Sequence, residues 1–198
     1  RVRSPVTTTA SGPLTSARRR VGLIARSRVA GDDADAARQR IWHSPGERWN
    51  PPDAAICRVH GDASMFAAGL TALLLQSLHP QAMAGVADHS DYRDDPWGRL
   101  QRTSRFIATT TFGTIADLIR TINHVHRGVV GVDHRGRPYE ARDPHLLRWV
   151  HVAEIWSFLE CHTRFGREPL SPQRRDEYVR EAARTGRMLG ARDVPTTD

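Results

Sequence analysis

The amino-acid sequence predicts an all-α protein, folded as a single-domain helical bundle. The chain of 198 residues is long enough for one domain with a sizeable core. From about residue 54 onward, apolar residues recur with a helical period, and capping residues or prolines mark the starts of several of these stretches. The composition, with 39% hydrophobic and 26% charged residues, is that of an ordinary globular domain. No internal repeat points to a different architecture.

The N-terminal part of the chain differs from the rest. Nine of the 29 arginines fall within residues 1–40 against three aspartates, so this stretch holds six of the seven net positive charges. It has no aromatic residue and no apolar period. We therefore expect residues 1–50 to be a disordered arginine-rich arm and linker, and residues 51–198 to form the helical domain. Because the charge belongs to the arm, we expect no nucleic acid as a partner of the domain; binding through the arm stays open as an alternative.

The two cysteines and the apolar runs exclude several classes of protein. Cys57 and Cys161 form no CxxC pair, which argues against a disulfide framework, a structural zinc site and covalently attached c-type haem. The longest apolar run, residues 65–78, is too short to cross a bilayer and suits a buried helix instead. The apolar stretch before Arg26 is too short for an export signal, so we expect a cytoplasmic protein. The oligomeric state stays open.

The first helices are expected at residues 63–78 and 81–87, on either side of His79 and Pro80. The residue before a proline is disfavoured in the helical conformation, so the first helix should end there. A polar turn then leads to Pro96, which suits the first turn of a helix over residues 96–112.

The remaining elements are marked by similar signals. Thr114 and Asp117 form a capping-box pattern for a helix over 114–130, with Gly131 as its C-cap. Residues 133–141 are expected to form a turn with a short extended pair. Asp143 with Pro144 begins a helix to about Phe165, and Ser171 with Pro172 begins the last helix, which Gly190 ends. The helix from 144 is apolar on most sides, so we expect it to be buried. One apolar face contains Leu147, Ile155 and Phe158, and the other contains Trp149, Val152, Trp156 and Leu159.

Helical geometry separates the two histidines of the segment "TINHVHRGVVG", residues 121–131. At about 100° per residue, His126 falls within the apolar stripe of the predicted helix and His124 on the opposite face. They therefore cannot chelate one metal together from a regular helix. His126 is either a core histidine satisfied by one hydrogen bond or an axial haem ligand, since a neutral imidazole in an apolar shell suits both. We expect His151, on the next helix, to be interior as well, and the same two interpretations apply to it.

Two further polar features have alternative interpretations. Arg102, Arg105 and Thr109 share one face of the helix 96–112, which is either solvated or a polar rim for a buried anion such as a haem propionate. His79 ends the first helix and can hydrogen-bond its last carbonyl groups.

Three long motifs point to a known family. "LLLQSLHPQAMAGV", "DPWGRLQRT" and "HLLRWVH" occur in this order, and residues 54–195 around them resemble the oxygenase domain family of the bacterial rubber oxygenase (latex clearing protein) and the fungal MpaB-type oxygenase. Most members are uncharacterised actinobacterial proteins. The resemblance implies a helical bundle around a buried haem b, held without a covalent bond. It implies an oxidoreductase that uses dioxygen on a hydrophobic small molecule.

The resemblance also implies roles for particular residues. His126 matches the proximal iron ligand of the rubber oxygenase, and "RFIAT" supplies the arginine and threonine that lie near the haem in that family. His151, in "RWVH", matches a later histidine needed for a sound haem site, and His79 matches a motif position. Together with the polar rim on the helix 96–112, these matches imply that the cofactor is bound by His79, Arg102, Arg105, His126 and His151, with His126 as the iron ligand. They imply catalytic roles for Arg105, Thr109 and His151.

Departures from the family support an alternative function. Trp156 stands where relatives commonly carry an aspartate, and Ala108 where the rubber oxygenase has a lysine, so that enzyme's oxygen-side chemistry and its polyisoprene substrate are not carried over. Relatives usually continue through further helices, so we expect a domain truncated at its C-terminus. The alternative is a truncated or degenerate member that acts as a non-catalytic helical binding module.

Overall fold

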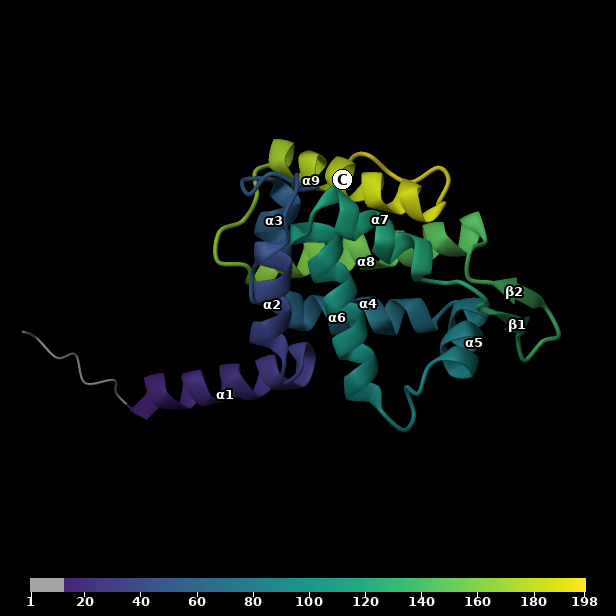
Figure 1. Ribbon diagram of the computed structural model, residues 1–198, viewed down its shortest axis with the longest axis horizontal. Coiled ribbons are helices and arrows are strands. Elements are labelled where there is room, and N and C mark those ends of the chain that lie inside the picture. Colours follow the sequence, from purple (N-terminus) through teal and green to yellow (C-terminus); the bar gives the residue numbers. More distant parts are fainter. Residues whose placement is uncertain (1–12) are drawn as a thin grey trace, which may run out of the picture.

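The computed structural model describes residues 13–198, and it is mostly helical, which confirms the all-α prediction (Figure 1). The predicted disorder of residues 1–12 lies outside the described residues. Two short strands form the one small sheet within the described range. In chain order the elements are α1 (Pro13–Ala30), α2 (Ala34–His43), α3 (Ala55–His60), α4 (Met65–Ser77), α5 (Pro80–His89), α6 (Pro96–Phe112), α7 (Ile115–His124), β1 (Val130–Val132), β2 (Pro138–Glu140), α8 (Pro144–Phe165) and α9 (Pro172–Leu189).

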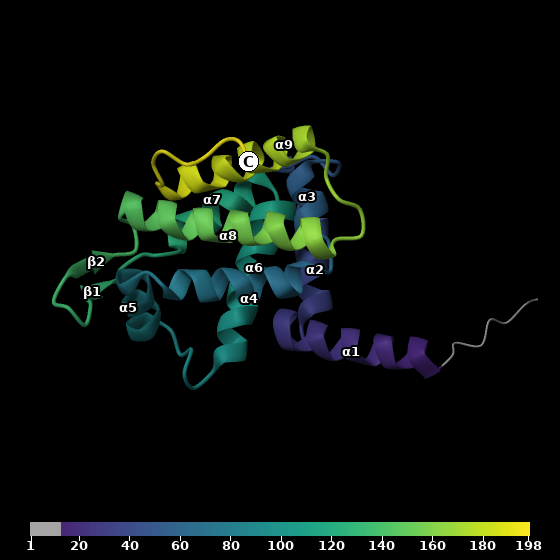
Figure 2. The same cartoon turned by 180° about the vertical axis from the view of Figure 1, so that it is seen from behind.

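Helix α8 runs through the body of the molecule, and other helices pack along it and across it (Figures 1 and 2). Helix α4 lies beside α8, while α9 packs against α8 and α3. Helix α6 packs against α3 and α7, and α5 lies with the hairpin at the opposite end of the body from α1. The arrangement leaves α4, α5, α6 and α8 around a common interior, where the cavities described below are found.

The antiparallel hairpin confirms the extended pair expected at residues 133–141. Val130 lies opposite Glu140, and Gly131 lies opposite Tyr139. The buried Tyr139 donates its hydroxyl hydrogen to Asp88 Oδ2 on α5 at 2.6 Å. This contact fixes the hairpin on α5, so the chain between α7 and α8 is held against the body.

The main core lies where α3, α8 and α9 meet. Ala55 and Val59 of α3, Phe158 of α8 and Ala182 of α9 are almost completely buried there, and Tyr178 is fully buried among them. Burial of apolar surface is the largest favourable contribution to folding, so this core contributes to the stability of the domain. Both cysteines, Cys57 and Cys161, lie buried as free thiols.

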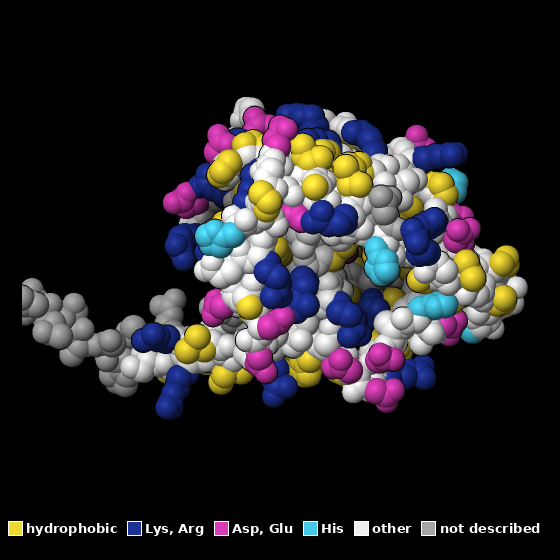
Figure 3. All heavy atoms as spheres, in the orientation of Figure 1, with side chains coloured by type: hydrophobic (Ala, Val, Ile, Leu, Met, Phe, Trp, Pro, Cys, Tyr) yellow, Lys and Arg dark blue, Asp and Glu magenta, His cyan; other side chains and the backbone are white. Residues whose placement is uncertain are grey.

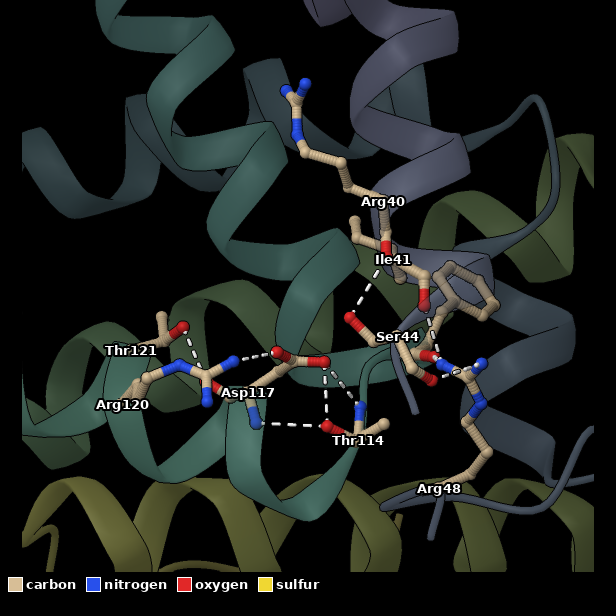
Figure 4. Close-up of polar contacts among 9 residues, drawn as sticks. Arg40, Ile41, Ser44, Arg48, Thr114, Asp117, Arg120 and Thr121 are labelled. Carbon is tan, nitrogen blue, oxygen red and sulfur yellow. Dashed lines mark hydrogen bonds and ion pairs between the residues drawn. The ribbon is translucent and has the colours of Figure 1, made fainter. Parts of the chain in front are cut away.

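Side-chain caps begin the helices where the sequence predicts them. Asp95, Asp143 and Ser171 each accept a hydrogen bond from a backbone N–H in the first turn, and each precedes a proline. Thr114 and Asp117 form the predicted capping box on α7 (Figure 4). These local signals place the starts of α6, α7, α8 and α9.

The prediction that residues 1–50 are disordered is wrong for residues 13–43, which form α1 and α2. Alanine and arginine are strong helix formers, so these two helices form without the apolar period whose absence suggested disorder. Polar contacts with α6 hold them instead: the Arg28 guanidinium lies 5.5 Å from the Trp97 ring centre, and Arg105 Nη2 is 2.9 Å from Asp33 Oδ1. The arm is therefore part of the described fold from residue 13 onward.

Arg48 ties the linker after α2 to the body of the domain. Its guanidinium donates hydrogen bonds to the carbonyl oxygens of Ile41 and Trp42, both at 2.6 Å, at the end of α2 (Figure 4). It also donates to the carbonyl oxygen of Phe112, at the end of α6, at 3.2 Å. One cation thus satisfies carbonyl groups at the ends of two helices, which otherwise have no partner within the helix.

Helix α7 is shorter than predicted. The sequence suggests a helix to residue 130, but α7 ends at His124, and His126 has a left-handed backbone with φ 64°. The chain turns at residues 125–128 and then enters β1. The helix cannot continue to residue 130, because Val130 pairs with Glu140 of β2. Helical periodicity in the sequence does not reveal this pairing.

Helices α4 and α8 are less buried than predicted. On α4 only Ala68 and Ala72 are buried, while Leu74 is 71% exposed. On α8, Trp156 is 53% exposed, although Phe158 and Leu159 lie in the core. Each helix packs with one face and presents its second apolar face to solvent. Among the described helices, none combines the length and apolarity needed to cross a membrane.

Candidate functional site

A cavity of about 350 Å³ lies between α4, α5, α6 and α8, with the turn after α7 and the C-terminal end of α9 closing its sides. Its volume is in the range of small-molecule sites, and most of its surface is apolar. We call it the larger cavity. Figure 3 shows the face of the molecule hollowed between α6 and α5, with arginine and histidine side chains around the opening.

His126 reaches the larger cavity from the turn after α7. Its ring is half-buried, and burial, reinforced by Arg142, lowers the pKa of its imidazole. His124, two residues earlier, is exposed and does not line the cavity. His126 thus lies at the cavity wall and His124 outside it, but a turn produces this separation and not the predicted helix face. A neutral imidazole at a cavity wall is the form that can coordinate a metal.

His151 reaches the same cavity from α8. It is buried, and burial, together with Arg187, lowers its pKa to about 4. A Cβ atom on Gly186 of α9 would come within 2.9 Å of the imidazole, so only glycine at this position leaves room for the ring. The close approach of α8 and α9 fixes where His151 lies.

Two arginines on one stripe of α6 complete the polar part of this cavity. Arg99 and Arg102 both line it, one turn apart. Burial, and then the neighbouring Arg102, lower the pKa of Arg99. Arg99 donates to Ser90 Oγ at 2.8 Å and has no carboxylate partner among the described residues, while Arg102 lies 3.8 Å from Asp95 Oδ2. Two like charges held this close favour an anionic ligand.

A second cavity of about 150 Å³, the smaller cavity, lies on the adjacent side of α6. Its walls come from α4, α6 and α8, with the end of α1 contributing Val29. Most of the lining is apolar, and it includes Ala72, Leu100, Ile107 and Phe158. Ala108 also lines this cavity.

Three polar residues line both cavities and form the boundary between them. They are Gln76 of α4, Thr103 of α6 and Glu154 of α8. The carboxyl of Glu154 has no hydrogen-bond or ion-pair partner within the described part of the chain, and burial raises its pKa to about 7. At neutral pH this group is divided between its acid and its carboxylate, so it can both donate and accept a proton.

A hydrogen-bonded chain extends from the smaller cavity into the core. His60 lines the cavity, with its Nδ1 2.7 Å from Thr111 Oγ1 and its Nε2 3.2 Å from the Tyr178 hydroxyl. Burial lowers the pKa of His60 to about 3, and burial with the nearby Glu154 raises that of Tyr178. Both ring nitrogens of His60 are occupied, whereas the side chains of Gln76, Ser104 and Glu154 line the smaller cavity without a hydrogen-bond partner in the described part of the chain.

The structure does not bring all the predicted site residues together. Arg105 lies on the outer side of α6, where it pairs with Asp33, and Thr109 donates to the carbonyl oxygen of Arg105 at 2.9 Å. Neither residue lines either cavity. His79 caps α5, accepting from the Ala82 N–H at 3.4 Å, and does not line a cavity either. Its partner is thus the helix that follows, not the helix that it ends.

Sequence reasoning missed Arg99, His89 and Glu154, all of which line the larger cavity. Arg99 could have been found from its spacing of three residues before Arg102, because residues three apart lie on one helix face. Glu154 has no such signal, since it lies in a stretch where apolar residues surround it on both sides.

No cluster of three or more metal-ligating side chains occurs among the described residues. A haem site requires no such cluster, because the porphyrin supplies four nitrogen ligands and the protein commonly supplies one axial histidine.

Comparison with known proteins identifies the family. Searches of curated proteins and of solved structures found no match. Residues 57–198, well over half of the chain, match the family model described as "ER-bound oxygenase mpaB/B'/Rubber oxygenase, catalytic domain". Family membership implies a small-molecule substrate and oxygen. With the fold and the cavity it surrounds, this match shows that the chain belongs to the family of mpaB-type and rubber oxygenase catalytic domains.

Proposed function

We propose that the protein is a haem b-dependent oxygenase that acts on a hydrophobic small molecule with dioxygen. The observation that carries the proposal is that one cavity brings His126 and His151 together with Arg99 and Arg102. These residues come from three separate parts of the chain and meet only through the fold.

The chemistry of the larger cavity fits a haem. A haem needs an apolar slot, an axial ligand and cations for its two propionates. His126 is a neutral imidazole at the wall, and the surrounding surface is mostly apolar. Arg99 and Arg102 supply two positive charges, and Glu154 is the one carboxylate in the described lining. The cavity is therefore positively charged overall, as a dianionic cofactor requires.

Each residue has a defined part in this proposal. His126 would ligate the iron, and Arg99 with Arg102 would hold the propionates. His151, kept neutral and fixed by Gly186, would orient the cofactor from the opposite helix. The apolar walls would exclude water from the reacting atoms. A bound haem would supply the activation of dioxygen, which protein side chains do not perform.

The proposed propionate site uses other residues than the pair that the family resemblance implies. That resemblance points to Arg105 and Thr109, whereas Arg99 and Arg102 are the arginines in the cavity wall. The proposal assigns the anion to the latter pair, because Arg105 already has a carboxylate partner outside the cavity.

The test is haem retention by His126→Ala, with His124→Ala as a matched control. Both changes remove an imidazole from the same short segment, but only His126 lines the cavity. After expression with a haem precursor, the Soret band and a pyridine haemochromogen assay should show near-stoichiometric haem b in the wild type and in His124→Ala. His126→Ala should retain little or none.

Full retention by His126→Ala would contradict the assignment of the iron ligand. Loss in His151→Ala or His79→Ala would then identify the ligand instead. Folded wild-type protein without a Soret band would contradict the proposed function and favour the non-catalytic binding module, an alternative that the exposed apolar side chains of α4 and α8 also support.

A further inference from the structure

We propose that the smaller cavity is a binding site for an apolar molecule of about benzene's size that carries one hydrogen-bond-accepting oxygen, held by Glu154 at the boundary with the larger cavity. Its role as the substrate site rests on the proposed function. The binding itself does not, because the smaller cavity is formed by the chain alone.

The dimensions of the smaller cavity limit the ligand. A protein cavity of about 150 Å³ is large enough to hold benzene. The smaller cavity has this volume, and apolar side chains such as Leu100, Ile107 and Phe158 form most of its wall. It therefore suits a small hydrocarbon, or the hydrocarbon end of a longer molecule.

The boundary residues add a polar requirement. The carboxyl of the half-buried Glu154 has no described hydrogen-bond partner, so it is available to pair with a ligand. In its neutral form the group donates one hydrogen bond, which a ketone, ether or ester oxygen can accept. Because Glu154 lines both cavities, an oxygen bound to it would lie where the ligand faces the larger cavity.

Replacing Gly69 of α4 by a larger residue should fill the smaller cavity without breaking other contacts. Gly69 lines the smaller cavity, and a Cβ atom there would meet no atom within 4 Å. Leucine is also a better helix former than glycine, so Gly69→Leu should fold. Ala67→Leu is the matched control, because Ala67 is exposed on the same helix and lines neither cavity.

The probes are cyclohexanone and methylenecyclohexane, which have nearly the same shape but differ in the oxygen. In an NMR titration both should bind the wild type, with cyclohexanone binding about three- to tenfold more tightly, the value of one hydrogen bond. Gly69→Leu should weaken both by at least about tenfold, because a side chain and a ligand cannot share one volume. Ala67→Leu should bind as the wild type does.

Variants at Glu154 test the polar part of the proposal. Glu154→Leu should bind both probes equally, while Glu154→Gln should keep the preference for cyclohexanone because its amide still donates. Binding that is unchanged in Gly69→Leu would overturn the site, and a ketone preference that survives in Glu154→Leu would overturn the role of Glu154.

The outcomes separate this inference from the proposed function. Stoichiometric haem with no binding of either probe would overturn the smaller cavity as a ligand site and leave the proposed function intact. Probe binding by a protein that takes up no haem would overturn the substrate role and the proposed function together, while the binding site itself would stand.

Discussion

The carboxyl of Glu154 lies among apolar side chains at the boundary of two cavities, where water does not fully solvate its charge. Burial raises the pKa of this group from 4.5 to about 7. In the unfolded chain the same group ionises near its ordinary value. The folded state therefore holds this proton over the range from about pH 4.5 to about pH 7 in which the unfolded state has lost it, and stability falls as the pH rises through that range.

Replacing Glu154 by glutamine should remove this pH dependence. Glutamine has nearly the same shape and never ionises, so Glu154→Gln should be more stable than the wild type at pH 8 by at most about 3 kcal/mol. At pH 4 both forms are neutral, and the two proteins should have similar free energies of unfolding. Urea denaturation at the two pH values measures the difference. An equal difference at pH 4 and pH 8 would show that the carboxyl is solvated in the folded protein.

At the scale of single elements, α6 shows how one helix serves two cavities. Arg99, Arg102, Thr103 and Phe106 face the larger cavity, whereas Leu100, Ile107 and Ala108 face the smaller one. Both sets follow the spacing of three and four residues that places side chains on one helical stripe. Arg105 falls outside both stripes, which is why it meets Asp33 of the arm instead.

Two arginine variants of α6 distinguish this arrangement from the one implied by family resemblance. Arg102→Gln removes a cation from the larger cavity, whereas Arg105→Gln removes one from the surface pair with Asp33. A charge-assisted hydrogen bond contributes about 1.5–3 kcal/mol, so Arg102→Gln should weaken haem binding by roughly tenfold or more. Arg105→Gln should leave it within about twofold of the wild type. Haem titration followed at the Soret band measures both, and the reverse order would place the propionates beside Arg105.

At the scale of the whole molecule, apolar surface is divided unevenly between a filled core and an exposed face. The junction of α3, α8 and α9 is buried, while Leu70 and Leu74 of α4, and Leu78 directly after it, are more than half exposed. A single exposed leucine contributes little to folding, because its surface stays in contact with water in both states. Substitutions in the core should therefore lower the free energy of unfolding more than substitutions on the exposed face of α4.

Replacing leucine by alanine at one buried and at one exposed position tests this expectation. Leu159→Ala, at a side chain 3% exposed, should lower the free energy of unfolding by about 2–5 kcal/mol through lost burial and the cavity left behind. Leu74→Ala, at a side chain 71% exposed, should change it by no more than about 0.5 kcal/mol. Chemical denaturation of the two variants gives both values. A large loss in Leu74→Ala would mean that another surface covers α4 in solution.

Much of this fold follows from local signals in the sequence. Pro96, Thr114, Asp143 and Ser171 mark the starts of their helices as predicted, because such signals act through backbone groups only a few residues away. The same locality explains the errors. The end of α7 depends on strand pairing between Val130 and Glu140, and the helices of the arm depend on contacts with α6, both of which join distant segments.

The candidate site divides in the same way. By itself, the sequence determined the helical class, the family and the burial of His151 on α8, since motifs and helical periodicity are local features of the chain. His126 lines the larger cavity because the chain turns after α7, which helical periodicity did not predict. Only the tertiary structure decided that Arg99 and Arg102 share a cavity with these histidines, that Arg105 does not, and that Glu154 lies between two cavities. A cavity is bounded by helices far apart in the chain, so its lining is fixed by how those helices pack.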